Sequence, residues 1–248
     1  MKKSIVLFLC FSCFNSLAQK NLINQELVWY GYYNSLSINE NWSLKSEIQE
    51  RHFVNPIKQH QLVFRSNLEK KLVDNLKLSI GMTLFLQSPN DPFSRSDLMV
   101  PELRPDIGFN NKQEFKRMSI SHRYKLEARF FHQVKNNELV DAYTFSNFRF
   151  RYQFVLDVPL IKKENQNKII LVLKDELMVN IGNKIVKNTF DQNRIYAGMN
   201  YVINSKLAVE MGYMNWFQQQ TTGVDFYNRN IFRLSLFHSL SLNNKKYE

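Results

Sequence analysis

Charged side chains recur at every second position in several segments of this chain. Two examples are residues 123–129, with the sequence RYKLEAR, and residues 148–152, with the sequence FRFRY. Residues two apart on a β-strand lie on the same face, so each segment would present one charged face. Guanidinium groups form bidentate pairs with carboxylates, and guanidinium groups without such a partner attract other anions. The pattern therefore predicts a polar surface that is either internally ion-paired or able to bind anions.

Catalytic chemistry has weaker support in the sequence. Nucleophilic catalysis needs a nucleophile, a base and an orienting group within hydrogen-bond reach, and no Ser-x-Gly type of turn accompanies His122 or His238. Asp91, Asp97 and Glu102 carry oxygen ligands of the kind that calcium prefers, but their spacing matches no recognised calcium loop. A solvated, proline-stiffened loop is the favoured interpretation there. We expect no enzyme activity, no metal site and no cofactor.

The N-terminus has the parts of a secretory signal peptide. Lys2 and Lys3 precede an apolar run over residues 4–14, and Ser16 and Ala18 occupy the positions that a signal peptidase reads. The run is too short for a membrane-spanning helix, which needs about 20 residues. We therefore expect residues 1–18 to be removed and residues 19–248 to form a single mature domain.

Export would change the chemistry available to the mature chain. Cys10 and Cys13 both lie in the expected signal peptide, so the mature chain would hold no thiol, disulfide or cysteine metal site. A lipoprotein cleaved before Cys13 is disfavoured, because the preceding residues match the usual pattern poorly. Loss of Lys2 and Lys3 lowers the formal charge from +11 to +9, which leaves the protein basic.

Alternation with a period of two residues covers most of the mature chain. It is clearest over residues 61–72, 117–130, 147–158 and 229–242, where one face is mainly apolar and the other is charged or amide-bearing. Weaker copies cover residues 24–38, 41–53, 76–87, 102–109, 168–180, 191–203 and 206–218. Most of these segments exceed the about 5 to 6 residues of an ordinary strand and fit the about 9 to 11 of a tilted membrane-crossing strand.

The connections between these segments differ in length. Short polar turns are expected at 39–41, 74–75 and 204–205, and longer polar segments at 54–60, 88–101, 133–142, 181–190 and 219–227. Short turns on one side and long loops on the other are typical of outer-membrane barrels. A secreted β-sandwich would alternate as well, but strand length, loop asymmetry and the export signal favour the barrel. We predict an all-β fold, a transmembrane antiparallel up-and-down β-barrel of about 10 to 12 strands, with 12 preferred because such barrels have even strand counts.

Four phrases occur together in this chain: RYKLEAR at 123–129, FRFRY at 148–152, DQNRIYAG at 191–198 and GYMN at 212–215. As an ordered set they resemble an uncharacterised family of Gram-negative outer-membrane β-barrels, a domain of unknown function, from about Trp29 to Leu242. The resemblance implies a barrel in the bacterial outer membrane and supplies no activity or catalytic residue. One departure is the polar tail after Leu242, since such barrels commonly end on an aromatic residue that the assembly machinery recognises.

If the apolar faces meet lipid, the charged faces line the interior of the barrel. Eleven basic and five acidic residues belong to these faces: Lys45, Glu47, Arg51, Arg65, Glu69, Arg123, Lys125, Glu127, Arg129, Arg149, Arg151, Glu176, Arg194, Glu210, Arg229 and Arg233. The lumen-lining candidates chosen from them are Arg65, Glu69, Arg123, Glu127, Arg129, Arg149, Arg151, Arg194, Glu210 and Arg233. A barrel of this size has little empty room, so an arginine–carboxylate network that fills the interior is one interpretation. The excess of basic residues supports the other, a lumen that favours anions.

The expected function follows from this lumen. We expect an outer-membrane β-barrel that binds or passes small anionic solutes through a basic, ion-paired lumen. The alternatives are a barrel with a structural or envelope-interaction role and no transport, and a lipid-modifying enzyme using His122 or His238. The expected partners are outer-membrane lipid, the outer-membrane assembly machinery and a small anionic solute, whereas nucleic acid is disfavoured for an exported chain.

Overall fold

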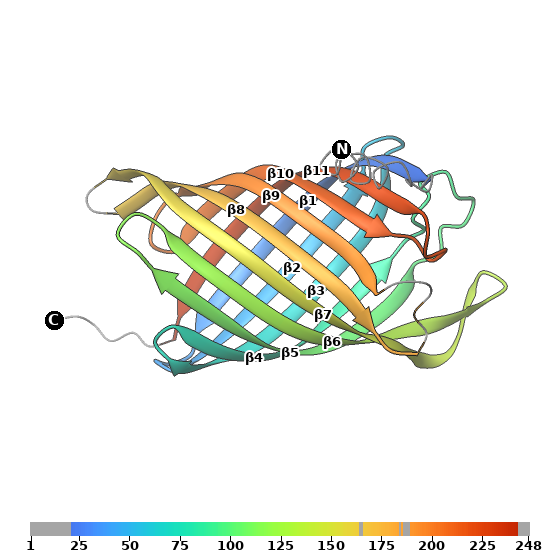
Figure 1. Ribbon diagram of the computed structural model, residues 1–248, viewed down its shortest axis with the longest axis horizontal. Helices are drawn as coiled ribbons and strands as arrows, with labels where there is room; N and C mark the ends of the chain where they lie inside the picture. Colours follow the sequence, from blue (N-terminus) through green and yellow to red (C-terminus); the bar gives the residue numbers. More distant parts are fainter. Residues whose placement is uncertain (1–20, 164–165, 184, 186–188, 243–248) are drawn as a thin grey trace, which may run out of the picture.

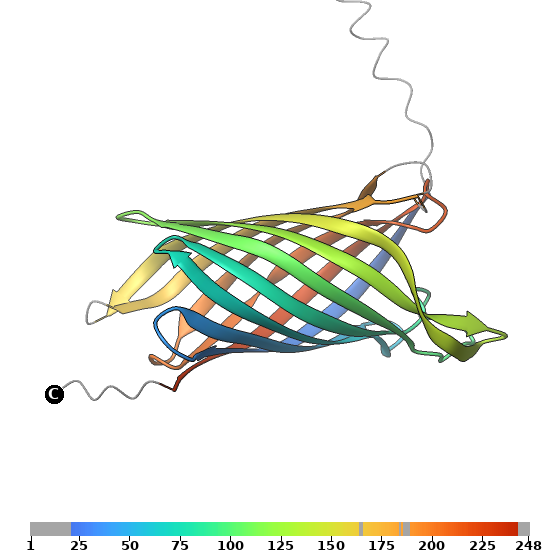
Figure 2. The same ribbon diagram turned by 90° about the horizontal axis from the view of Figure 1, so that it is seen from below.

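Eleven β-strands of the described chain close into a barrel in this computed structural model (Figure 1 and Figure 2). The structure describes residues 21–163, 166–183, 185 and 189–242, and the expected signal peptide lies outside them. The strands are β1 (Leu22–Ser37), β2 (Trp42–Phe53), β3 (Lys58–Val73), β4 (Leu76–Gln87), β5 (Val100–Glu114), β6 (Ser119–Lys135), β7 (Glu138–Lys163), β8 (Gln166–Ile181), β9 (Phe190–Val202), β10 (Leu207–Gln219) and β11 (Phe226–Ser241). Within these residues, no helix has the length and apolar character needed to cross a membrane.

The barrel closes through a parallel seam between β1 and β11. Each strand pairs antiparallel with its successor, whereas β1 and β11 run side by side in the same direction, from Leu22↔Phe226 to Ser37↔Ser241. An odd number of up-and-down strands makes this unavoidable, because the first and last strands then point the same way. The predicted all-β barrel is confirmed and its range of strand counts includes eleven, but the preference for twelve is not met.

The two ends of the barrel carry different connections. The connections 38–41, 74–75, 115–118 and 203–206 lie at one end, which we call the short-turn end. The opposite end carries the longest described connection, 88–99, and we call it the long-loop end. The segment 133–142, expected to be a loop, is instead the tip of the β6–β7 hairpin, which projects past the barrel (Figure 1). Its turn residues Asn136 and Asn137 have φ angles of 53° and 61°, as a type I′ hairpin turn requires.

The two faces of the strands have opposite chemistry. On the outward face Phe64, Leu126 and Phe148 are each about two-fifths exposed, while Glu127 and Arg151 on the inward face are buried. An apolar exterior around a charged interior is the reverse of a water-soluble protein and is typical of transmembrane barrels. The alternation along each strand therefore sorts side chains between the inside and the outside of the barrel, as the sequence predicted.

The interior has two walls of different composition. The charged wall, on β5 to β9, holds the ion pairs described below. The aromatic wall, mainly on β1, β2 and β9 to β11, contains a buried apolar cluster: Leu27, Trp29, Phe53, Val172, Tyr196, Met214, Trp216 and Ile231. Trp29 and Trp216 meet edge to face with ring centroids 5.6 Å apart. This division matters for function because arginines on the two walls have different partners.

Candidate functional site

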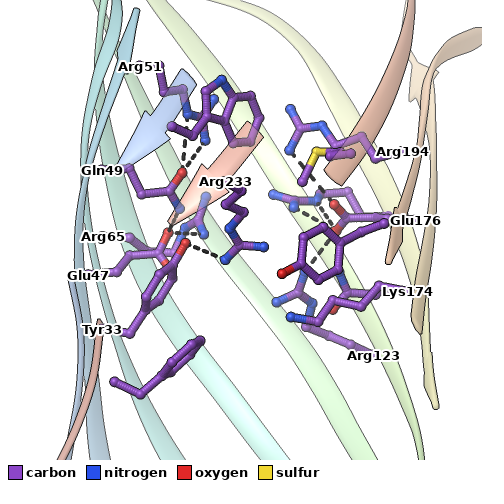
Figure 3. Close-up of a pocket in the computed structure, with 16 residues that line it drawn as sticks. Tyr33, Glu47, Gln49, Arg51, Arg65, Arg123, Lys174, Glu176, Arg194 and Arg233 are labelled. Atoms are coloured by element: carbon purple, nitrogen blue, oxygen red, sulfur yellow. Dashed lines mark hydrogen bonds and ion pairs between the residues drawn. The ribbon is translucent and has the colours of Figure 1, made fainter. Parts of the chain in front are cut away.

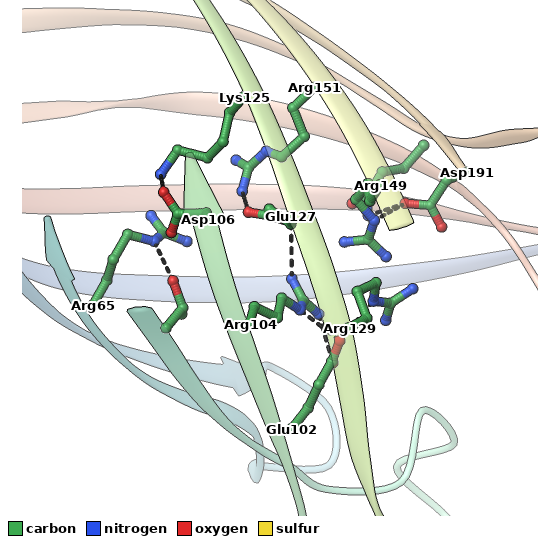
Figure 4. A network of polar contacts seen from close by, with 12 residues as sticks. Arg65, Glu102, Arg104, Asp106, Lys125, Glu127, Arg129, Arg149, Arg151 and Asp191 are labelled. Atoms are coloured by element: carbon green, nitrogen blue, oxygen red, sulfur yellow. Dashed lines mark hydrogen bonds and ion pairs between the residues drawn. The ribbon is translucent and has the colours of Figure 1, made fainter. Parts of the chain in front are cut away.

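Ion pairs link neighbouring strands along the charged wall (Figure 4). The Arg151 guanidinium on β7 donates to Glu127 Oε1 on β6 at 2.5 Å and to Glu176 Oε1 on β8 at 2.6 Å. Arg123 Nη2 donates to the same Glu176 oxygen at 2.8 Å. The buried carboxylates are thus shared between arginines, which compensates their charge inside the barrel.

A second part of the network surrounds Glu102 on β5. Both oxygens of Glu102 accept hydrogen bonds from Arg104 at 2.6 Å, and Arg129 Nε donates to Oε1 at 2.6 Å. Arg149 Nε lies 2.9 Å from Asp191 Oδ2. The candidates Arg123, Glu127, Arg129, Arg149 and Arg151 therefore all belong to this paired wall.

The other five candidates make further contacts, and one of them, Arg194, lies 3.8 Å from Glu176 of the paired wall. Arg65 pairs with Glu47 and donates to Thr83 Oγ1 at 2.8 Å. Glu69 accepts a hydrogen bond from Asn110 at 3.1 Å, and Glu210 lies 2.9 Å from Lys174 Nζ. Arg194 donates to Gln192 at 2.9 Å, and Arg233 donates to the hydroxyl of Tyr33 at 2.6 Å.

Several charged residues of the interior were not among the lumen-lining residues predicted from the sequence. They are Glu102, Arg104, Asp106, Lys174 and Asp191, all in contact with residues of the network or the cavity. The residues from 102 to 106 do alternate between charged and other side chains, but prolines at 101 and 105 weakened the strand pattern. Asp191 is the second residue of β9 and begins the segment 191–203 that the sequence predicted as a strand, but it was not counted among the inward-facing charges.

The structure separates Glu102 from Asp91 and Asp97, the residues with which it was considered as a calcium ligand. Glu102 is fully buried in β5 and engaged by two arginines, whereas Asp91 and Asp97 lie in the connection 88–99. Among the described residues, no group of three or more His, Cys, Asp or Glu side chains is placed to hold a metal ion.

Arginines near the aromatic wall are held by amides. Arg51 donates to Gln49 at 2.7 Å and to Gln61 at 2.6 Å, with its guanidinium carbon 3.8 Å from the centroid of Trp29. Arg229 donates to Gln25 at 2.7 Å, Gln218 at 2.5 Å and Asn90 at 2.9 Å. Within the described chain, Arg51, Arg229 and Arg233 have no carboxylate oxygen within 4.0 Å. Amides orient Arg51 and Arg229, and a tyrosine hydroxyl orients Arg233. These partners are uncharged, so the three arginines keep a net positive field in the interior.

A cavity of about 250 Å³ lies between the two walls (Figure 3). Seven cationic side chains and two carboxylates line it: Arg51, Arg65, Arg123, Arg151, Lys174, Arg194, Arg233, Glu47 and Glu176. The lining therefore carries an excess of positive charge, even though several of its arginines belong to ion pairs. Such a lining attracts anions and disfavours cations.

Further cavities lie on either side of this central cavity. One of about 370 Å³ at the long-loop end is rich in amides, including Asn147, Asn180 and Gln218. One of about 220 Å³ contains Lys45 and Asn67 and lies toward the short-turn end. The interior is thus a series of polar cavities separated by side chains.

The two histidines considered for catalysis lie on outward faces. His122 Nδ1 is 2.9 Å from the hydroxyl of Tyr152, and His238 Nδ1 is 2.9 Å from the hydroxyl of Tyr32. Both are contacts with aromatic neighbours on adjoining strands. The sequence-based expectation that neither histidine is catalytic stays a prediction.

Comparison with solved structures finds a porin with a similar fold. The chain resembles the crystal structure of the NanC porin with a TM-score of 0.52 and 12% sequence identity, over 86% of this chain and 99% of that one. At this identity the likeness concerns the fold alone. Comparison with curated protein sequences gives no match.

The family comparison agrees with the resemblance that rests on the four sequence motifs described above. Residues 26–228 match the family model described as "Protein of unknown function (DUF2490)". The match runs from within β1 to within β11 and so includes the whole paired wall and most of the central cavity, whose lining residues Arg233 and Phe237 lie beyond it. The chain belongs to the DUF2490 family.

Proposed function

We propose that this protein is an outer-membrane β-barrel that binds small anions in its lumen and lets them pass. The observation that carries the proposal is the central cavity, where cationic side chains outnumber carboxylates by seven to two. Arg51 and Arg233 on its lining have no carboxylate partner within 4.0 Å among the described residues. A small carboxylate, phosphate or inorganic anion would supply the missing negative charge.

The proposed location is supported by the exterior of the barrel. Apolar side chains such as Ile80, Ile195 and Phe232 are more than half exposed on the outward faces, which would be costly in water and favourable in lipid. The closed sheet satisfies its backbone hydrogen bonds without water, as a membrane requires. The porin-like fold and the signal-peptide pattern at residues 1–18 are consistent with export to the outer membrane.

Passage is supported by the way the cations are held. Conduction needs sites that bind an ion well enough to admit it and weakly enough to release it. Side chains in the charged wall are locked in pairs, while Arg51 on the aromatic wall is oriented by Gln49 and Gln61. Glu47 and Glu176 on the cavity lining compete with an entering anion for the arginines. The result is a lumen with weak to moderate anion sites.

The proposal is tested by single-channel recording of the folded protein in a planar bilayer under a salt gradient. We expect small, reproducible current steps with a reversal potential on the anion-selective side. Arg51→Gln and Arg233→Gln should each shift that potential toward zero, while Arg95→Gln, the same charge removal on the exposed connection 88–99, should leave it unchanged. A barrel that is demonstrably folded but carries no current and binds no anion would contradict the proposal and favour a non-transporting envelope role.

A further inference from the structure

We infer that the central cavity selects planar, aromatic carboxylates, with the carboxylate on Arg233 and the ring against Tyr33 and Tyr196. This inference rests on the proposed anion-binding function and adds the class of anion. Arg233 on β11 and Tyr33 on β1 point toward each other across the parallel seam (Figure 3). Tyr196 lies on β9 and also lines the cavity.

The Tyr33 ring lies over Gly31, which has no side chain. A Cβ atom added at Gly31 would come within 2.6 Å of the Tyr33 ring, so only glycine lets the ring take this position. The ring also stacks on Phe237, with centroids 4.8 Å apart and an interplanar angle of 16°. The two rings form an aromatic surface at one side of the cavity, and both residues line it.

Tyr196 also lies over glycine residues. Gly198 on β9 and Gly212 on β10 are register partners, and Tyr196 reaches over both. A Cβ atom at Gly212 would lie 2.7 Å from the Tyr196 hydroxyl, and one at Gly198 would also collide with it. Larger residues at these glycines would push the ring into the cavity. Glycine thus keeps both tyrosine rings against the wall of the cavity.

Arg233 provides the charge between these rings. Its guanidinium carbon lies 5.3 Å from the Tyr33 centroid and 5.4 Å from the Tyr196 centroid. Its Nη2 donates to the Tyr33 hydroxyl at 2.6 Å, which fixes the guanidinium without neutralising it. A carboxylate would accept two parallel hydrogen bonds from such a fork, and an attached flat ring would gain face or edge contacts with the tyrosines.

The size of the cavity limits the ligand to a single ring. Pockets for drug-sized molecules are about 300 to 1,000 Å³, and this cavity is about 250 Å³. Benzoate is therefore a suitable probe. Cyclohexanecarboxylate is its natural comparison, because it has the same charge and number of ring atoms but is neither flat nor aromatic.

The test measures binding of both probes to the detergent-folded protein by calorimetry, and block of the ionic current by each probe. We expect benzoate to bind about tenfold more tightly than cyclohexanecarboxylate, since its ring would form an aromatic pair with each tyrosine. Tyr33→Leu and Tyr196→Leu should each reduce this ratio severalfold with a smaller effect on cyclohexanecarboxylate. Tyr201→Leu is the matched control, because Tyr201 lies on β9 but is 53% exposed on the outward face.

The possible outcomes distinguish failure of the aromatic preference from failure of the proposed anion-binding function. Equal affinity for the two probes, with anion selectivity intact, overturns the aromatic preference and leaves the anion lumen standing. An aromatic preference that persists in both Tyr33→Leu and Tyr196→Leu also overturns it. Absence of binding by either probe together with absence of anion selectivity overturns the proposed function as well. The heat-dependent shift in electrophoretic mobility of folded barrels verifies that each variant has folded.

Discussion

Arg151 reaches diagonally across the charged wall to Glu127, with 2.5 Å between Nη1 and Oε1. The two are not direct register partners: Lys125 faces Arg151 and Glu127 faces Arg149 across the β6–β7 pair. Glu127 is fully buried, and Arg151 also binds Glu176 on β8. One guanidinium therefore joins three consecutive strands, and Glu127 compensates a charge that is almost removed from solvent.

Removing the negative charge of Glu127 should destabilise the barrel. Glu127→Gln leaves Arg151 with one carboxylate fewer and takes a negative charge from the neighbourhood of Arg104, whose Nη1 is 3.9 Å from Glu127 Oε2. Breaking a buried ion pair costs about 3 to 5 kcal/mol, and we expect a loss of unfolding free energy toward that range. Urea unfolding in lipid vesicles, followed by tryptophan fluorescence, measures it. The same change at Glu114, which pairs with Lys112 at an exposed site, should cost less than about 1 kcal/mol. Equal losses would show that the network does not stabilise the fold.

The two faces of β6 should respond differently to an introduced charge. Leu126→Arg places a cation on the outward face, where Leu126 is 40% exposed, and should cost about 2 to 4 kcal/mol if that position lies at the bilayer midplane. Ser121→Arg, on the inward face of the same strand, should be mild. Folding yield and urea stability in vesicles of a fixed lipid provide the measurement, and similar costs on both faces would refute the assignment.

The parallel seam can be tested with a disulfide. Tyr30 on β1 and Leu234 on β11 are register partners and both face outward. Neighbouring strands are about 4.8 Å apart, within the range that a disulfide spans. Tyr30→Cys with Leu234→Cys should therefore cross-link in residues 19–248, which contain no other cysteine. Tyr30→Cys with Ser235→Cys is the control, because Ser235 is buried on the opposite face. Non-reducing electrophoresis that finds no bond in the first pair would rule out closure of β1 on β11.

Asn90 should anchor the connection 88–99 inside the long-loop end. Its Oδ1 accepts a hydrogen bond from Arg229 at 2.9 Å, and its backbone oxygen accepts one from Gln25 at 2.8 Å. Asn90→Ala removes the first of these bonds. We expect faster trypsin cleavage after the exposed Arg95 and a larger single-channel conductance. Asn39→Ala, in a turn at the short-turn end, should change neither. Unchanged cleavage in Asn90→Ala would mean that other contacts hold this connection.

The division of side chains between two faces could be predicted from the sequence. The period of two residues is a local property of strands, so alternation alone places Arg149 and Phe148 on opposite faces, and the expected lipid exterior places Arg149 inside. The barrel class could also be predicted, because strand length and the polar content of one face can be read directly from the sequence. The hairpin at 133–142 was missed, since polar residues near strand ends look like loop residues.

Local sequence patterns do not predict how the barrel closes or which arginines lack a carboxylate partner. Arg51 and Arg151 have the same chemistry and the same alternating context, yet one is held by glutamines and the other by glutamates. The difference arises because partners come from neighbouring strands, and their register and the curvature of the wall bring particular side chains together. Those distances depend on the closure of the whole sheet, which no local pattern in the sequence encodes.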